Sequence, residues 1–122
     1  LKINNIRVSL FVDASNDQIE MSQKMGADIV EIHSGEFCRK VHDELDYENE
    51  LSKIKESVSF ANSIGLEPHI GHGITFKSIV ELSNIKNVKE FNIGHFIIGE
   101  SIFIGLKESI RTFKSLIKEG RS

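Results

Sequence analysis

The sequence holds a single cysteine, Cys38, among its 122 residues. One cysteine excludes an internal disulfide and a zinc site built from several thiolates. No apolar run approaches the roughly 20 residues that cross a bilayer. The N-terminus also lacks the charged and then apolar layout of a signal peptide. These absences together predict a cytoplasmic protein.

A strong excess of charge of either sign is lacking as well, because the formal net charge is −3 at pH 7. Proteins that bind nucleic acid or membrane surfaces through bulk charge carry a marked basic excess. We therefore expect neither nucleic acid nor a membrane as a partner. The length and the 39% of hydrophobic residues are those of one ordinary domain.

Four segments with strand character alternate with segments of helical character. The predicted strands are residues 7–13, 28–33, 67–71 and 91–94; the first alternates apolar and polar residues, and the third has Pro68 at its beginning. The segment 34–45 is mostly polar and is interpreted as an irregular loop that carries Cys38 and His42, with His33 also assigned to loop structure.

Apolar residues at helical spacing predict four helices. Ser15 and Gln18 have the spacing of a capping box, so the first helix is expected to begin there and to run to Met25. The second follows a continuous stripe through residues 47–61, the third is short and covers residues 76–82, and the last is a single long helix with its stripe over residues 102–117.

Regular alternation of strands and helices implies parallel strands joined by right-handed crossovers. A complete (β/α)8 TIM barrel needs about 250 residues. The fold prediction is therefore α/β, with residues 1–122 supplying about the last four βα units of one TIM-barrel domain. Such a half-barrel has two bare sheet edges, at residues 7–12 and 91–94. Because the sequence begins with Leu1 rather than methionine, the other half is expected upstream.

Two Gly-His turns follow the third and fourth predicted strands. Residues 71–73 read Gly-His-Gly, and Gly94 and His95 repeat the step. Barrel active sites lie at the carboxyl ends of the strands, and phosphate is often held after the last two strands. Backbone N–H groups beside glycine can cradle an anion. The alternative is that these glycines only relieve crowding in tight turns.

His72 is the main candidate for proton transfer, because glycines flank it at the rim that substrate reaches. The alternative is a surface or hydrogen-bonded structural histidine. His69 and His72 lack a partner cluster of carboxylates or thiolates, so no metal site is predicted.

Glu31 is the second candidate. It lies between Val30 and Ile32 in a predicted strand and points to the opposite face, which would be the inside of a barrel. A buried carboxylate is costly unless it pairs with a cation or acts on substrate. The alternative is an exposed acid at a ragged strand end. Asp13 is a weaker candidate of the same kind.

These residues, taken in series, resemble the C-terminal half of the pyridoxine 5′-phosphate synthase family. The segments that carry the resemblance are residues 7–13 (RVSLFVD), 31–35 (EIHSG), 71–75 (GHGIT), 92–95 (NIGH) and 97–99 (IIG). They occur in the family's order and at similar spacing. Where some relatives carry an arginine after the last segment, this chain has Glu100.

The resemblance implies a transferase of vitamin B6 biosynthesis. Enzymes of the family that this sequence resembles condense 1-deoxy-D-xylulose 5-phosphate with 3-amino-2-oxopropyl phosphate. They use no cofactor and form homo-octamers. By motif, His72 resembles the family's proton donor and Glu31 its transition-state-stabilising acid. Gly73, together with Gly94 and His95, resembles the contacts to the aminoketone substrate. Further catalytic residues belong to the absent half, so the fragment alone is expected to be inactive.

Two other functions stay open at this point. One is another phosphate-binding TIM-barrel enzyme, such as a sugar-phosphate isomerase or an aldolase. The other is a non-catalytic half-barrel that associates with itself through its bare edges and binds phosphate without turnover.

Overall fold

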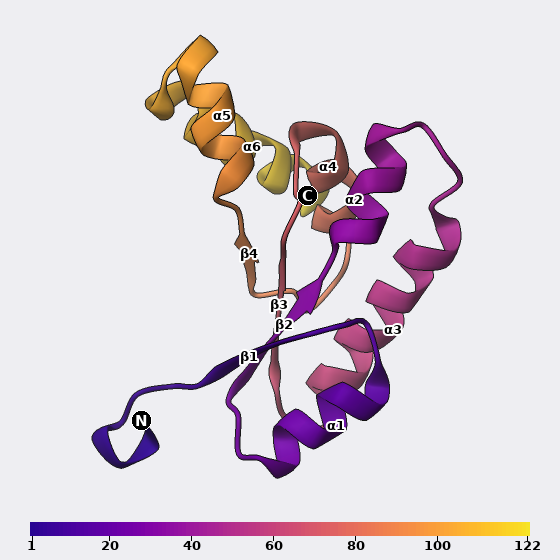
Figure 1. Cartoon of the computed structure of the whole chain (residues 1–122), viewed down its shortest axis with the longest axis vertical. Helices are drawn as coiled ribbons and strands as arrows, with labels where there is room; N and C mark the ends of the chain where they lie inside the picture. Colours follow the sequence, from indigo (N-terminus) through magenta and orange to yellow (C-terminus); the bar gives the residue numbers. More distant parts are fainter.

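The computed structural model describes all 122 residues and contains one parallel sheet (Figure 1). Its strands follow one another in the order β1-β2-β3-β4, with neighbouring strands parallel. The strands are β1 (Ser9–Val12), β2 (Ile29–His33), β3 (Glu67–Gly71) and β4 (Glu90–Asn92). The structure confirms the α/β class and the two bare edges, which are β1 and β4.

Helices connect the strands and extend the chain beyond β4. They are a short 3-10 helix η1 (Lys2–Asn4), α1 (Asn16–Lys24), α2 (Gly35–His42), α3 (Glu48–Ser63), α4 (Phe76–Ser83), α5 (His95–Ile104) and α6 (Leu106–Gly120). None of them combines the length and the apolar character that crossing a bilayer requires.

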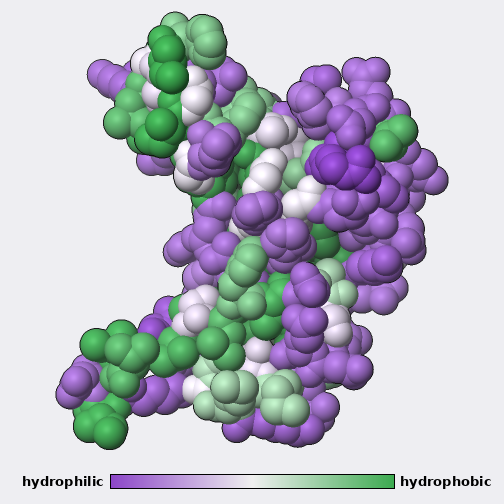
Figure 2. All heavy atoms as spheres, in the orientation of Figure 1, coloured by the Kyte–Doolittle hydropathy of each residue, from purple (hydrophilic) through white to green (hydrophobic).

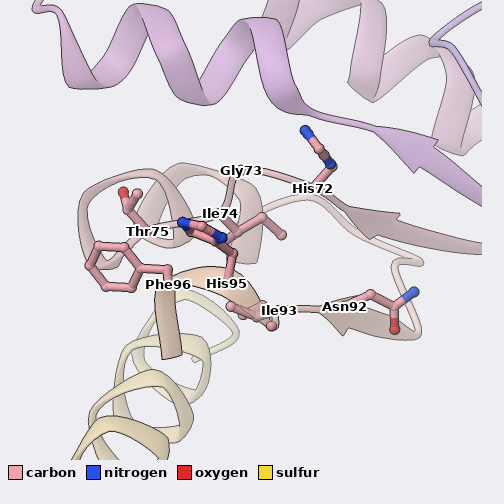
Figure 3. A pocket seen from close by; sticks show the side chains of 9 residues that line it. His72, Gly73, Ile74, Thr75, Asn92, Ile93, His95 and Phe96 are labelled. Carbon is pink, nitrogen blue, oxygen red and sulfur yellow. The ribbon is translucent and has the colours of Figure 1, made fainter. Parts of the chain in front are cut away.

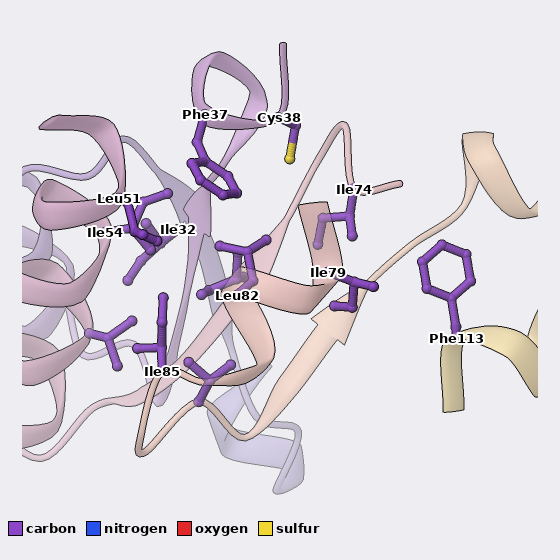
Figure 4. Packing of buried hydrophobic residues seen from close by; sticks show 13 residues of the cluster. Ile32, Phe37, Cys38, Leu51, Ile54, Ile74, Ile79, Leu82, Ile85 and Phe113 are labelled. Atoms are coloured by element: carbon purple, nitrogen blue, oxygen red, sulfur yellow. The ribbon is translucent and has the colours of Figure 1, made fainter. Parts of the chain in front are cut away.

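The hydrophobic core lies on one face of the sheet. Ile32 and Ile70, both fully buried, project there from β2 and β3 and belong to one packed cluster with residues of α3, α4 and α6 (Figure 4). The helical members of that cluster include Leu51, Ile54, Val58, Ile79, Leu82 and Phe113. Helices α1 to α4 accordingly lie to one side of the sheet in Figure 1.

The opposite face of the sheet is polar, and we call it the open face. Phe11, Glu31 and His69 occupy equivalent positions on β1, β2 and β3, one residue out of phase with the core residues. Because side chains alternate along a strand, these three project away from the helices. Phe11 is 56% exposed, so the open face is not covered at its β1 edge.

The segment 34–45 is not an irregular loop, as the sequence suggested, because most of it forms α2. Phe37 and Cys38 are buried in the core, with Val41 packed against it, which gives the segment a short apolar stripe. Arg39 forms ion pairs with Glu36 and Asp43 at helical spacing. The many charges conceal this stripe in the sequence, since they lie on the exposed side. Cys38 and His42 are therefore helical.

The prediction of a single long final helix was also wrong. The structure has two helices, α5 and α6, which meet at Gly105 with φ 84° and ψ 147°. Almost only glycine adopts this backbone region. The chain turns there, so Ile102 is 80% exposed on α5 while Phe113 is buried on α6. Their side chains do not form one stripe.

The first helix begins where the sequence predicts, although its expected capping box is absent. Ser15 is the N-cap residue of α1, but its side chain makes no capping hydrogen bond. Gln18 instead bonds to Asp13: the backbone N–H of Asp13 donates to its Oε1 at 2.9 Å, and its Nε2 donates to Oδ2 of Asp13 at 3.2 Å. The Gln18 side chain thereby ties the end of β1 to α1.

Candidate active site

The two Gly-His turns lie side by side at the carboxyl ends of β3 and β4. They line one cavity of about 470 Å³ (Figure 3). Its lining includes four of the residues singled out in the sequence, namely His72, Gly73, Gly94 and His95. Adjacent parallel strands end at the same edge, which explains why two segments far apart in the sequence meet here.

His72 has an unusual backbone conformation. Its φ is +76°, and that of Gly73 is +77°. A side chain in this left-handed region costs about 1–2 kcal/mol relative to the right-handed one. The hydroxyl of Ser34 lies 2.9 Å from the carbonyl oxygens of both Gly71 and His72 and shares its single proton between them in a bifurcated hydrogen bond. The backbone N–H of Ser34 donates to the Gly71 carbonyl, also at 2.9 Å.

The imidazole of His72 packs against that of His33. The ring centroids are 4.7 Å apart and the ring planes differ by 29°, so the two rings are stacked. Phe11 contacts the His33 ring edge-on at 5.2 Å. A β-carbon at Gly35 would lie 2.8 Å from Cε1 of His33 and 3.0 Å from Cδ2 of His72. A side chain at position 35 would therefore push the stacked pair of rings out of its present place.

Glu31 lies on the open face and does not line the cavity, but it is joined to a residue that does. Its Oε2 accepts a hydrogen bond of 2.6 Å from Nδ2 of Asn92, the last residue of β4. On the other side, a β-carbon at Gly71 would overlap Oε1 of Glu31. The carboxylate therefore occupies the space that the missing side chain leaves. Its partner is thus an amide rather than a cation.

The two helices that begin at the cavity differ in how their first turns are capped. At α4, the Thr75 hydroxyl accepts from the backbone N–H of Ser78, and the Ser78 hydroxyl accepts from the Thr75 N–H. At α5, Gly94 is the N-cap residue and offers no side-chain cap. The first N–H groups of α5 are thus free to bind an anion.

Other residues considered from the sequence lie away from the cavity. His69 bonds to Glu67 through Nε2 at 2.8 Å on the open face, and no group of three or more potential metal-binding side chains is present. Burial raises the pKa of the Cys38 thiol, so the thiol stays protonated and unreactive. Cys38 therefore serves to pack the core. Glu100 lies in the second turn of α5 and does not line the cavity.

Three residues of this region were missed in the sequence: His33, Ser34 and Asn92. His33 ends β2, as it ends the predicted strand 28–33, although loop structure was also predicted for it. A signal for two of them was present in the predicted strands. His33 follows Glu31 by two residues, and Asn92 precedes Gly94 by two, so each pair would share one face of its predicted strand. Nothing in the sequence indicated the bonds of the Ser34 hydroxyl.

Comparison with known proteins gives a consistent result. The family model described as "Pyridoxal phosphate biosynthesis protein PdxJ" matches residues 1–119. Proteins named pyridoxine 5′-phosphate synthase are 39% identical over 121 residues in Sulfurihydrogenibium sp., 42% over 112 residues in Pelagibacter ubique and 40% over 124 residues in Xanthobacter autotrophicus. These matches cover 99%, 92% and 100% of this chain. They cover 49%, 47% and 48% of the relatives, so the chain spans about half the length of the curated relatives it matches.

Proposed function

This chain belongs to the PdxJ family of pyridoxal phosphate biosynthesis proteins, and we propose that it serves in a pyridoxine 5′-phosphate synthase. The proposed transferase condenses 1-deoxy-D-xylulose 5-phosphate with 3-amino-2-oxopropyl phosphate to give pyridoxine 5′-phosphate, phosphate and water. The observation that carries the proposal is the cavity where His72 and Gly73 face Gly94 and His95. The upstream half of the barrel would supply the remaining catalytic groups, in a homo-octamer such as the resembling family forms.

His72 acts in this proposal as the proton donor. Schiff-base formation and loss of water both require protons to be delivered to oxygen atoms, and histidine carries an exchangeable proton near neutral pH. His72 is exposed at the rim of the sheet, where a substrate reaches it. Glu31 lies on the adjoining strand, and its carboxylate stabilises positive charge that develops on the condensing nitrogen.

The cavity between the turns binds the aminoketone phosphate. The uncapped first turn of α5 presents N–H groups and the positive end of the helix dipole, both of which favour a phosphate group. His95 is the first residue of that helix and is exposed to the cavity. On the wall of the cavity opposite α5, Gly73 has no side chain, so its backbone can approach the ligand closely. The proposed reaction needs no cofactor.

Replacement of His72 tests the assignment. In the complete protein, His72→Asn should lower kcat about 100-fold or more, which is the usual contribution of a positioned general acid. His42→Asn is the matched control, because His42 is exposed at the end of α2, away from the cavity. Full synthase activity in the His72→Asn protein would exclude His72 as the proton donor.

A second function is favoured by the two bare sheet edges. β1 and β4 each lack a neighbour on one side, and such edges pair readily with other chains. The 122-residue chain could then be a half-barrel that associates with itself and binds phosphate without turnover. Its mass in solution separates the two functions: a folded, stable dimer favours this one, whereas aggregation of the isolated chain favours the synthase fragment.

A further inference from the structure

We infer that Ser34 and His33 are positioning residues that hold the His72 imidazole in its working orientation. This inference rests on the proposed role of His72 as the proton donor. Neither residue contacts the cavity between the Gly-His turns. Each of them contacts His72 instead, one through the backbone and one through the ring.

The Ser34 hydroxyl fixes the backbone on both sides of His72. Its two acceptors are the carbonyl oxygens of Gly71 and His72, each at 2.9 Å. These carbonyls belong to the two peptide groups that flank the α-carbon of His72, so restraining both restrains the φ and ψ angles between them. Ser34 is only 1% exposed, and its bonds leave no hydrogen-bond donor for a substrate.

The ring of His33 fixes the side chain of His72 in turn. Stacking at 4.7 Å restricts how far the His72 imidazole rotates about its side-chain bonds. His33 is itself held by the edge of Phe11, at 5.2 Å. Close packing at Gly35 confines both rings further. Backbone and ring of His72 are therefore held by consecutive residues at the end of β2.

The serine is tested by Ser34→Ala and Ser34→Thr in the complete protein. Ser34→Ala should lower kcat about tenfold while KM changes less than about twofold, because the acid is misaligned and substrate binding is not the step affected. The imidazole NMR signals of His72, assigned by their loss in His72→Asn, should shift, whereas those of His42 should not. Ser34→Thr keeps the hydroxyl and should restore both readouts.

The ring is tested by His33→Ala and His33→Phe with the same readouts. His33→Ala removes the stacked surface and should reproduce the loss of kcat and the shift of the His72 signals. His33→Phe keeps a flat ring and should restore most of kcat. This pair decides the inference if Ser34→Ala does not fold.

Unchanged His72 signals in Ser34→Ala and in His33→Ala would overturn the inference. A loss of kcat that neither Ser34→Thr nor His33→Phe restores would also overturn it, since such a loss would reflect general destabilisation. The proposed function is tested by a different result. If His72→Asn keeps full activity, the proposed function is wrong, but the NMR signals in the Ser34 and His33 variants still show whether these two residues position the His72 ring.

Discussion

At Gly71, the end of the Glu31 side chain occupies the place where a β-carbon would lie. The φ angle of Gly71 is not positive, so its backbone conformation does not require glycine. A β-carbon at this position would, however, overlap Oε1 of Glu31. Gly71→Ala should therefore push the carboxylate away from Asn92. Because the hydrogen bond between Asn92 and Glu31 is lost, we expect a loss of about 1–3 kcal/mol of unfolding free energy, together with reduced activity of the complete protein in the proposed reaction.

Denaturant unfolding measures the loss of stability in Gly71→Ala, and Gly99→Ala is the matched control. Gly99 lies within α5, and a β-carbon there would meet nothing within 4 Å. Alanine is a better helix former, so that variant should be unchanged or more stable by up to about 1 kcal/mol. A Gly71→Ala protein as stable and as active as the parent would contradict the packing described for Glu31.

The positions of the site residues were predictable to different degrees. The convergence of His72 with His95 follows from parallel strands and was predicted. The stack of His33 on His72 and the bond from Asn92 to Glu31 were not, because they depend on side-chain packing between strands. Sequence periodicity indicates the face on which a residue lies, but not the neighbour that it touches.

At the scale of elements, Gly105 separates α5 from α6. Its φ of 84° with ψ of 147° is strained for any residue with a side chain. Gly105→Ala should cost about 1–3 kcal/mol of stability and favour a continuous helix across the junction. Circular dichroism should then show unchanged or increased helix content despite the lower stability. A variant as stable as the parent would show that the break does not depend on glycine.

Glu67 links β3 to the chain before β1 and makes stability depend on pH. His69, and then Arg7 at 2.8 Å, donate to its carboxylate and lower its pKa. The folded state therefore binds the proton more weakly than the unfolded state, and the pairing stabilises the fold above the ordinary glutamate pKa of about 4.3. This stabilisation is lost as the pH falls below that value and approaches the lowered pKa.

Glu67→Gln tests this dependence. The variant should be less stable than the parent at about pH 7, and the difference should shrink as the pH is lowered from about 5 to about 3. Denaturant unfolding at several pH values measures it. A difference that stays constant over this range would show that the carboxylate charge contributes nothing to folding.

The number and order of the strands could be predicted, since strand-like segments alternate regularly with helical ones along the chain. The helices were less predictable where local sequence and tertiary packing disagree. In α2 only Phe37, Cys38 and Val41 pack toward the core, and the surrounding charges hide them. In the final segment, apolar residues continue at helical spacing across Gly105, and only the backbone geometry shows that the helix ends.

At the scale of the whole molecule, apolar side chains are exposed at two ends of the open face. Figure 2 shows them over α5 and over the N-terminal segment. Ile102 and Phe103 on α5 are 80% and 83% exposed. Exposed apolar patches promote association, so the 122-residue chain should associate with itself through α5.

Replacing both residues by aspartate should lower the average mass of the 122-residue chain in sedimentation experiments without reducing its stability, because neither side chain is buried. Leu45→Asp is the matched control: Leu45 is 49% exposed outside the helices and distant from α5 along the chain. If the double variant sediments like the parent, association proceeds through another surface such as the strand edges.

The α/β architecture follows from the alternation of strands and helices. The exposure of α5 did not follow, because a helix of such apolar composition is typical of a buried one. Its residues would be interior only if a further surface covered them. Sequence composition reports what an element prefers to contact, not whether a partner is present.

Helix α5 contains no buried residue, and its first turn forms a wall of the cavity. Helices with few buried contacts open locally at little free-energy cost, so the amide hydrogens of α5 should exchange with solvent sooner than those of α6. The anion that we propose to bind at the N-terminus of α5 would be lost whenever that turn opens. Occupancy of the cavity and closure of α5 are therefore thermodynamically linked, and each favours the other.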